Sequence, residues 1–91
     1  MVLKGGVLVI RKQVGNQIRE LRLIKKISQE KLAFKAGIDR TYLASVEKGK
    51  RNISIINLEK IIKALDTDFA IFFKDISWSK NNDFTPQQQK T

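Results

Sequence analysis

The sequence predicts an all-α fold of five helices, and three observations support this. The one proline is Pro86, and between Val14 and Asp66 only Gly37, Gly49 and a few capping residues interrupt the chain. Apolar residues in this stretch recur at intervals of three and four, which is the spacing of one face of a helix. No alternation of polar and apolar residues is long enough to indicate a strand.

The first two helices are predicted at residues 8–26 and 29–36. The apolar face of the first helix repeats at helical spacing through Val14, Ile18 and Leu21. Ser28 is a favourable N-cap for the second helix, because its hydroxyl can accept a hydrogen bond from a free backbone N–H. Gly37 suits the left-handed position at which a helix ends.

A third helix is predicted at residues 40–48, between two clear boundary signals. Asp39 is a strong N-cap, and Gly49 ends the helix. Leu43 and Val46 form its inner face, because they lie three residues apart.

The fourth and fifth helices follow a short polar loop. Ser54 is the predicted N-cap of the fourth, whose apolar stripe runs through Leu58, Ile61, Ile62 and Leu65. Thr67 or Asp68 opens a fifth helix at 69–76, which is apolar on nearly every side. Residues 1–76 are therefore expected to form one domain, followed by a polar, disordered tail at 77–91.

The composition narrows the possible functions. The 91 residues include 18 Lys and Arg against 9 Asp and Glu, a net charge of +9, and neither histidine nor cysteine. The missing residue types exclude disulfides, Cys/His zinc sites and catalysis by Ser-His-Asp or Cys-His groups. The excess charge indicates a polyanionic partner, with nucleic acid ahead of an anionic membrane. Residues 14–65 hold most of it, with 12 basic and 5 acidic side chains.

Other features argue against a membrane protein and against an enzyme. The longest apolar run covers only residues 7–10, far short of the ~20 residues of a membrane span. The acidic residues Asp39, Glu47, Asp66 and Asp68 lack the convergent spacing of a metal site. A cytoplasmic protein with no metal, no cofactor, no small-molecule ligand and no catalytic residues is therefore expected.

The two helices around Gly37 carry the functional signal. Two short helices joined by a tight turn containing glycine form a helix-turn-helix pattern, here at about residues 28–48. In such a motif the second helix lies in the major groove of DNA, with its first residues at the base edges. Arg40 can donate two hydrogen bonds to guanine, and Thr41 can contact a thymine methyl group or a base acceptor.

Several segments resemble a known family. They are IRELR (18–22), SQEKLA (28–33), AGI (36–38), VEKG (46–49) and LEKIIKAL (58–65). Together they are similar to the phage-repressor-type, or lambda-repressor-like, helix-turn-helix domain. DRTYL (39–43), GKRNISIINLE (49–59) and Phe72-Phe73 are also similar to the controller proteins of type II restriction–modification systems. Those are small all-helical homodimers that bind operators.

The resemblance implies a role for each of a set of residues. The implied base contacts are Arg40, Thr41 and Tyr42. Ser45, on the same helix, is expected to contact a base as well, and for Thr41 and Ser45 the alternative is a contact to phosphate or water. The implied contacts to the DNA backbone are Gln29, Arg51 and Asn52. The position of the loop beside the third helix predicts further phosphate contacts at Lys48 and Lys50, with an ordinary charged loop as the alternative. Ser54 and Asn57 are also expected to contact the DNA backbone. For Tyr42, phosphate contact, base contact and partial packing stay open, and Arg51 is also allowed a base contact.

The resemblance further implies a structural ion pair between Arg22 and Glu47, because the family places an arginine of the first helix against this inner acid. The excess of apolar residues in the fifth helix predicts a dimer surface. Its residues are Phe69, Phe72, Phe73 and Ile76. The alternative is a tightly wrapped monomer with a few exposed aromatic side chains.

The predicted function is thus a sequence-specific transcriptional regulator that binds a double-stranded operator as a homodimer, and a restriction–modification controller is favoured. An antitoxin or a phage-type repressor on the same fold is the nearer alternative. A module that docks a protein or RNA is the more distant one.

Overall fold

The computed structural model describes residues 2–76, with side chains from residue 9 onward. Five helices occur in this range: α1 (Val2–Ile24), α2 (Gln29–Ala36), α3 (Arg40–Glu47), α4 (Ile55–Ala64) and α5 (Phe69–Lys74). The predicted all-α, five-helix fold is confirmed. The predicted tail at 77–91 lies outside the described residues. Within the described residues, no helix is long and apolar enough to cross a membrane.

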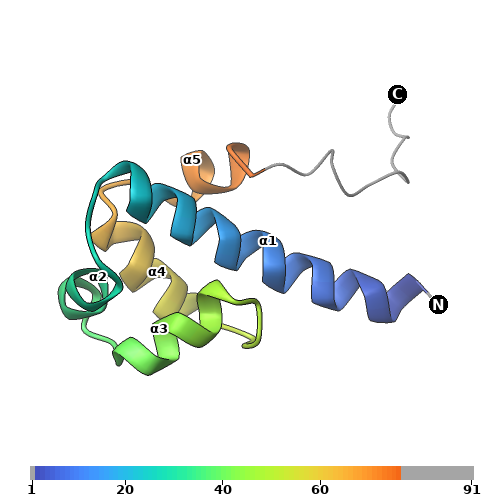
Figure 1. Ribbon diagram of the computed structural model, residues 1–91. Coiled ribbons are helices and arrows are strands. Elements are labelled where there is room, and N and C mark those ends of the chain that lie inside the picture. Colours follow the sequence, from blue (N-terminus) through green and yellow to red (C-terminus); the bar gives the residue numbers. More distant parts are fainter. Residues whose placement is uncertain (1, 77–91) are drawn as a thin grey trace.

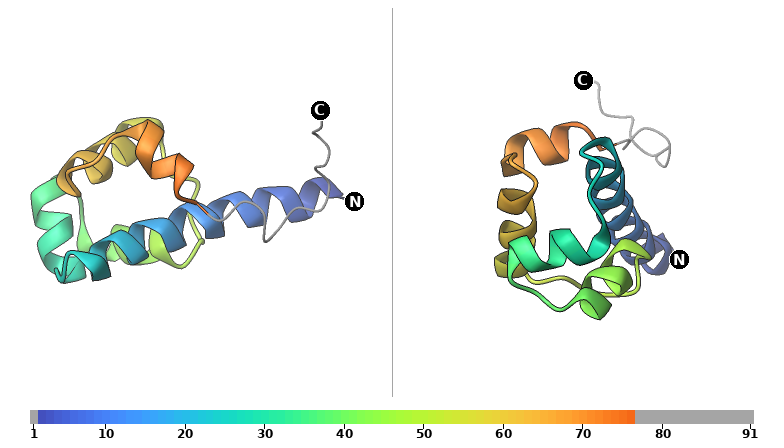
Figure 2. Two further views of the ribbon diagram at one scale, coloured as in Figure 1. Left: turned by 90° about the horizontal axis from the view of Figure 1, so that it is seen from above. Right: turned by 60° about the vertical axis from the view of Figure 1, so that its left-hand side comes forward.

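The helices pack around one core. α1 lies against α3, α2 packs on both α3 and α4, and α5 lies against α4. The N-terminal half of α1 extends well beyond the other four helices (Figures 1 and 2). Every helix contributes to the core, whose buried apolar residues are Val14, Ile18, Leu32, Ala33, Ala36, Leu43, Val46, Leu58, Ile61, Ile62, Ala64, Leu65, Phe72 and Ile76.

The predicted helix caps are present. The side-chain oxygens of Ser28, Asp39 and Ser54 each accept a hydrogen bond from a backbone N–H in the first turn of the helix that follows. Asp68 caps α5 in the same way. Gly37 ends α2 with a left-handed backbone (φ 71°), which glycine adopts without a steric penalty.

Three helices have boundaries that differ from the prediction, and the smallest difference is in α3, which ends at Glu47 instead of residue 48. α1 begins at Val2 instead of residue 8, because a helix already nucleated in the core gains a backbone hydrogen bond with each residue added. It ends at Ile24, and Lys26 then turns the chain with a positive φ of 57°. α5 ends at Lys74 instead of residue 76.

Gly15 lets α1 approach the end of α3 closely. A Cβ atom at this position would lie 2.1 Å from the carbonyl oxygen of Val46 and 2.8 Å from that of Glu47. Backbone atoms form this contact, so no side-chain rotation could relieve it. Only glycine therefore fits here without moving one helix.

The aromatic residues of α5 do not all face outward as predicted. Phe72 has no exposed surface and Ile76 is buried, so both belong to the core of the single chain. This corrects their assignment to a dimer surface. The physical reason is that α5 packs with this side toward α4, so that the core is deep enough to enclose them. Phe69 is 36% exposed, Ile71 is 51% exposed and Phe73 is partly buried.

Candidate nucleic-acid interface

The start of α3 is held rigidly and presents two side chains to solvent. The Asp39 carboxylate accepts hydrogen bonds from the backbone N–H groups of Thr41 (2.9 Å) and Tyr42 (3.2 Å). Arg40 and Thr41 are exposed on this first turn, and Ser45 lies one turn further along, partly buried. A helix whose first turn is capped and whose outer side chains are free has the form needed to enter a groove.

Tyr42 connects α3 with the following loop and with α4. Its hydroxyl oxygen accepts a hydrogen bond from the side-chain amide of Asn57 (3.3 Å). The guanidinium carbon of Arg51 lies 5.1 Å from the centre of the Tyr42 ring, within the range of a cation–π interaction. Tyr42 is partly buried, so of the three roles left open by the sequence, packing is present in the structure. The ring also restricts where the Arg51 guanidinium can lie.

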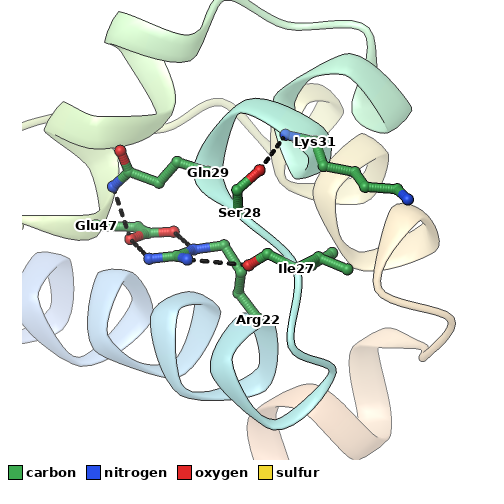
Figure 3. Close-up of polar contacts among 6 residues, drawn as sticks. All are labelled: Arg22, Ile27, Ser28, Gln29, Lys31 and Glu47. Atoms are coloured by element: carbon green, nitrogen blue, oxygen red, sulfur yellow. Dashed lines mark hydrogen bonds and ion pairs between the residues drawn. The ribbon is translucent and has the colours of Figure 1, made fainter.

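A buried polar network lies behind the motif (Figure 3). The Arg22 guanidinium donates two hydrogen bonds to the Glu47 carboxylate, at 2.8 and 3.0 Å, and a third to the carbonyl oxygen of Ile27 at 3.1 Å. The side chains of Arg22 and Glu47 are only 11% and 2% exposed. The hydrogen bond to Glu47 raises the pKa of Arg22 above its usual value and outweighs the opposite effect of burial. The predicted ion pair is therefore present, with both partners hydrogen-bonded.

The same network holds Gln29 at the first turn of α2. Its side-chain amide donates at 3.0 Å to Oε1 of Glu47, an oxygen that also accepts a hydrogen bond from Arg22, as Figure 3 shows. Gln29 was singled out as a contact to the DNA backbone, and here its position depends on a buried carboxylate in α3. Arg22 and Glu47 thus connect α1, α2 and α3 through one set of contacts.

The loop after α3 carries most of the remaining predicted contacts. Lys48, Lys50, Arg51 and Asn52 are all exposed. The hydroxyl oxygen of Ser54 accepts a hydrogen bond from the backbone N–H of Asn57 (3.1 Å), so its first role is to cap α4. Exposed cations on a loop beside a recognition helix are suited to phosphate oxygens.

Two basic residues of α1 also reach this loop, and sequence reasoning did not connect them with it. Arg11 donates a long hydrogen bond to the side-chain oxygen of Asn52, at 3.5 Å. Lys12 lies against Gly49, whose positive φ of 75° turns the loop toward α1. The positive charge of residues 1–13 was the available signal, but the sequence does not say which loop it meets. Among the described residues, no three acidic side chains gather as a metal site would require.

Comparison with known proteins decides the family. A family model described as helix-turn-helix matches residues 18–72, which is more than half of the chain. The chain belongs to the helix-turn-helix family. This is a family of DNA-binding transcription regulators and not a class of enzymes.

Relatives of this helix-turn-helix chain include restriction–modification controller proteins, as the sequence resemblance predicted. The control protein C.BamHI of Bacillus amyloliquefaciens is 51% identical over 57 residues, which cover 62% of this chain and 70% of the relative. The crystal structure of the controller C.AhdI from Aeromonas hydrophila matches with a TM-score of 0.69 and 43% identity, covering 71% of this chain and 98% of that one.

A third relative has been solved with DNA. The controller C.Esp1396I, as a tetramer in complex with its natural 35 base-pair operator, matches with a TM-score of 0.68 and 39% identity, covering 70% of this chain and 84% of that one. Further structures of the same protein carry single substitutions of an arginine, a threonine or a tyrosine at three consecutive positions.

Proposed function

We propose that this chain is a sequence-specific transcriptional regulator of the restriction–modification controller type, which binds an operator as a homodimer. The observation that carries the proposal is the capped first turn of α3, with Arg40 and Thr41 exposed beside a basic loop. DNA regulators of this form place such a turn in the major groove and bind phosphates on either side of it.

The residues divide into two groups under this proposal. Arg40, Thr41, Tyr42 and Ser45 read the bases, and the arginine has the geometry for a bidentate contact to guanine. Gln29 and the loop residues bind the DNA backbone and set the register of α3. The residues of the loop and of the first turn of α4 that bind the DNA backbone under this proposal are Lys48, Lys50, Arg51, Asn52, Ser54 and Asn57. Arg51 is stacked on Tyr42, which holds its guanidinium ready with little loss of side-chain freedom.

The relatives support the assignment of the base-reading turn. The three consecutive residues replaced in C.Esp1396I are an arginine, a threonine and a tyrosine, and the same tripeptide stands here at 40–42. That relative binds its operator as a tetramer. By analogy, a dimer of this chain would cover two half-sites about 10–10.5 bp apart on one face of the duplex.

The test is a gel shift with the DNA immediately upstream of the chain's own gene, in the presence of excess competitor DNA. Under this proposal a discrete complex survives the competitor, and a methylation-interference footprint shows two symmetric half-sites. Binding that disappears at about 200 mM salt with no fragment surviving competition would instead favour a module that docks protein or RNA.

Arg40→Ala is expected to weaken binding to the operator by about 1–3 kcal/mol and to relax the preference at one base pair, because two hydrogen bonds to a base edge are lost. Competitive gel shifts measure the affinity, and selection of binding sites from random DNA measures the preference. Lys35→Ala, which removes an exposed cation from α2, is the matched control. An unchanged consensus from the Arg40 variant would refute the base contact.

Lys50→Ala is expected to weaken specific and non-specific DNA equally and to lower the slope of log K against log salt by about one, because one phosphate contact is lost. Titrations at several salt concentrations with operator and with random DNA of equal length measure both quantities. Lys60→Ala, an exposed cation on α4 outside the loop, serves as the control. A slope equal to that of the unaltered protein would remove Lys50 from the interface.

A further inference from the structure

The exposed apolar surface of α5 is too small for a stable dimer. With Phe72 and Ile76 buried in the core, only Phe69 (36% exposed) and Ile71 (51% exposed) offer large apolar side chains on this helix. A side chain of this size has a surface area of about 150–250 Å². At the exposed fractions of Phe69 and Ile71, the two side chains together expose no more than about 250 Å² of apolar surface. A specific interface buries about 800 Å² on each partner. A dimer formed through α5 must therefore include further surface.

An open apolar groove continues from α5 toward α1. It has a volume of about 300 Å³, and the loop residues Arg51 and Asn52 and the Arg11 side chain line it beside its apolar walls. The apolar walls are formed by Ile10, Val14, Val46, Ile53, Leu58 and Phe73. Phe73 stacks on Phe69 with a distance of 6.3 Å between ring centres, so the groove begins where the exposed part of α5 ends. Ile10, at the far end of the groove, is 40% exposed.

We propose that this groove is the second part of the dimer interface and takes apolar side chains from another copy of the chain. The inference rests on the homodimer proposed above. It adds the N-terminal half of α1 to an interface that the sequence predicted at α5 alone. Ile10 and Val14 lie one helical turn apart and so face the same side. The matched family region begins at residue 18, so this part of α1 is outside it.

Two physical arguments favour a second copy as the occupant. In a two-fold dimer the same patch lies on both sides, so a surface with a groove beside two exposed apolar side chains is suited to receive itself. The N-terminal half of α1 also extends beyond the other helices (Figure 1), and a helix without tertiary contacts is only marginally stable in water. A partner covering Ile10 would stabilise that half.

The first test measures the dimer constant of the full chain by sedimentation in the absence of DNA. Ile10→Gln is expected to raise the dissociation constant at least about tenfold, because it places an amide in the apolar groove. Leu23→Gln is the matched control, since Leu23 is 46% exposed near the other end of the same helix and does not line the groove. It should leave the constant unchanged. Thermal unfolding followed by circular dichroism checks that both variants are folded.

The second test uses the absence of cysteine from the chain. In Ile10→Cys, the new thiol is expected to react more slowly with a maleimide as the protein concentration rises through the dimer constant. In Leu23→Cys, the rate should not depend on concentration. Protection at position 10 that is independent of concentration would mean that the chain's own residues 77–91 fill the groove, and this would overturn the inference.

The outcomes separate this inference from the proposed function. If Phe69→Gln dissociates the dimer and Ile10→Gln does not, the groove is not part of the interface, while operator binding by the unaltered dimer stands. If the unaltered protein sediments as a monomer at all concentrations tested, both the groove and the homodimer are wrong. If a dimer forms through the groove but no DNA fragment survives competition, only the regulator assignment fails.

Discussion

Glu47→Ala is expected to lower the free energy of unfolding by about 3–5 kcal/mol, because it leaves the buried guanidinium of Arg22 without its charged partner. Both hydrogen bonds from that guanidinium to the carboxylate are lost, and so is the one from Gln29. Urea unfolding followed by circular dichroism measures the change. In a domain of this size such a loss is a large fraction of the total stability.

The control for Glu47 is a second ion pair on the surface. Glu59 and Lys63 lie 3.7 Å apart on α4 with both side chains exposed, and such pairs contribute at most about 0.5 kcal/mol. Glu59→Ala should therefore change the unfolding midpoint very little. A double-mutant cycle of Arg22→Ala and Glu47→Ala should show strong coupling. Equal effects of the Glu47 and Glu59 variants would mean that the buried network does not support the fold.

The Glu47 variant should also bind DNA less tightly at temperatures where it remains folded. The carboxylate holds the Gln29 side chain at the start of α2, and without it this side chain has to be ordered when the DNA binds. Gln29→Ala separates the two effects, because it removes the proposed backbone contact and leaves the Arg22–Glu47 pair in place.

Gly15→Ala is expected to destabilise the protein by about 3 kcal/mol, the upper end of the usual cost of overpacking, because the new methyl group would overlap the backbone of α3. The methyl carbon would lie 2.1 Å from the carbonyl oxygen of Val46, so α1 and α3 would have to move apart. Helix propensity alone predicts the opposite sign, since alanine is favoured over glycine inside a helix by about 1 kcal/mol. The direction of the change therefore distinguishes the two explanations.

Thermal and urea unfolding of two companion variants make the Gly15 result specific. Asn16→Ala changes the exposed next position of α1 and should be nearly neutral. Gly37→Ala meets no atom within 4 Å, so its cost should be limited to the left-handed backbone, about 1–2 kcal/mol. A stabilised or unchanged Gly15 variant would show that α1 and α3 are not in close contact.

The helix boundaries could be read from the sequence because their signals are local. Ser28, Asp39 and Ser54 each accept a hydrogen bond from a backbone group two or three residues away, and Gly37 ends a helix through its own φ. The start of α3, and with it the exposure of Arg40 and Thr41, followed from these signals. The start of α1 was missed because Val2 carries no such cap.

The ion pair of Arg22 with Glu47 was expected only through the resemblance to a family. The two residues are 25 positions apart, and nothing in their own neighbourhoods identifies them as partners. The sequence did not predict the stacking of Arg51 on Tyr42 or the partner of Arg11, because each contact depends on how a loop folds back onto a helix.

The sequence by itself determined the helix type, most of the caps and the exposure of Arg40 and Thr41 on the first turn of α3, since these depend on groups within about one helical turn of each other. Only the tertiary structure decided that Phe72 belongs to the core and that Gly15 has to be a glycine. Burial and close approach depend on surfaces brought together from distant parts of the chain, and an apolar residue looks the same in the sequence whether its own core or a second copy covers it.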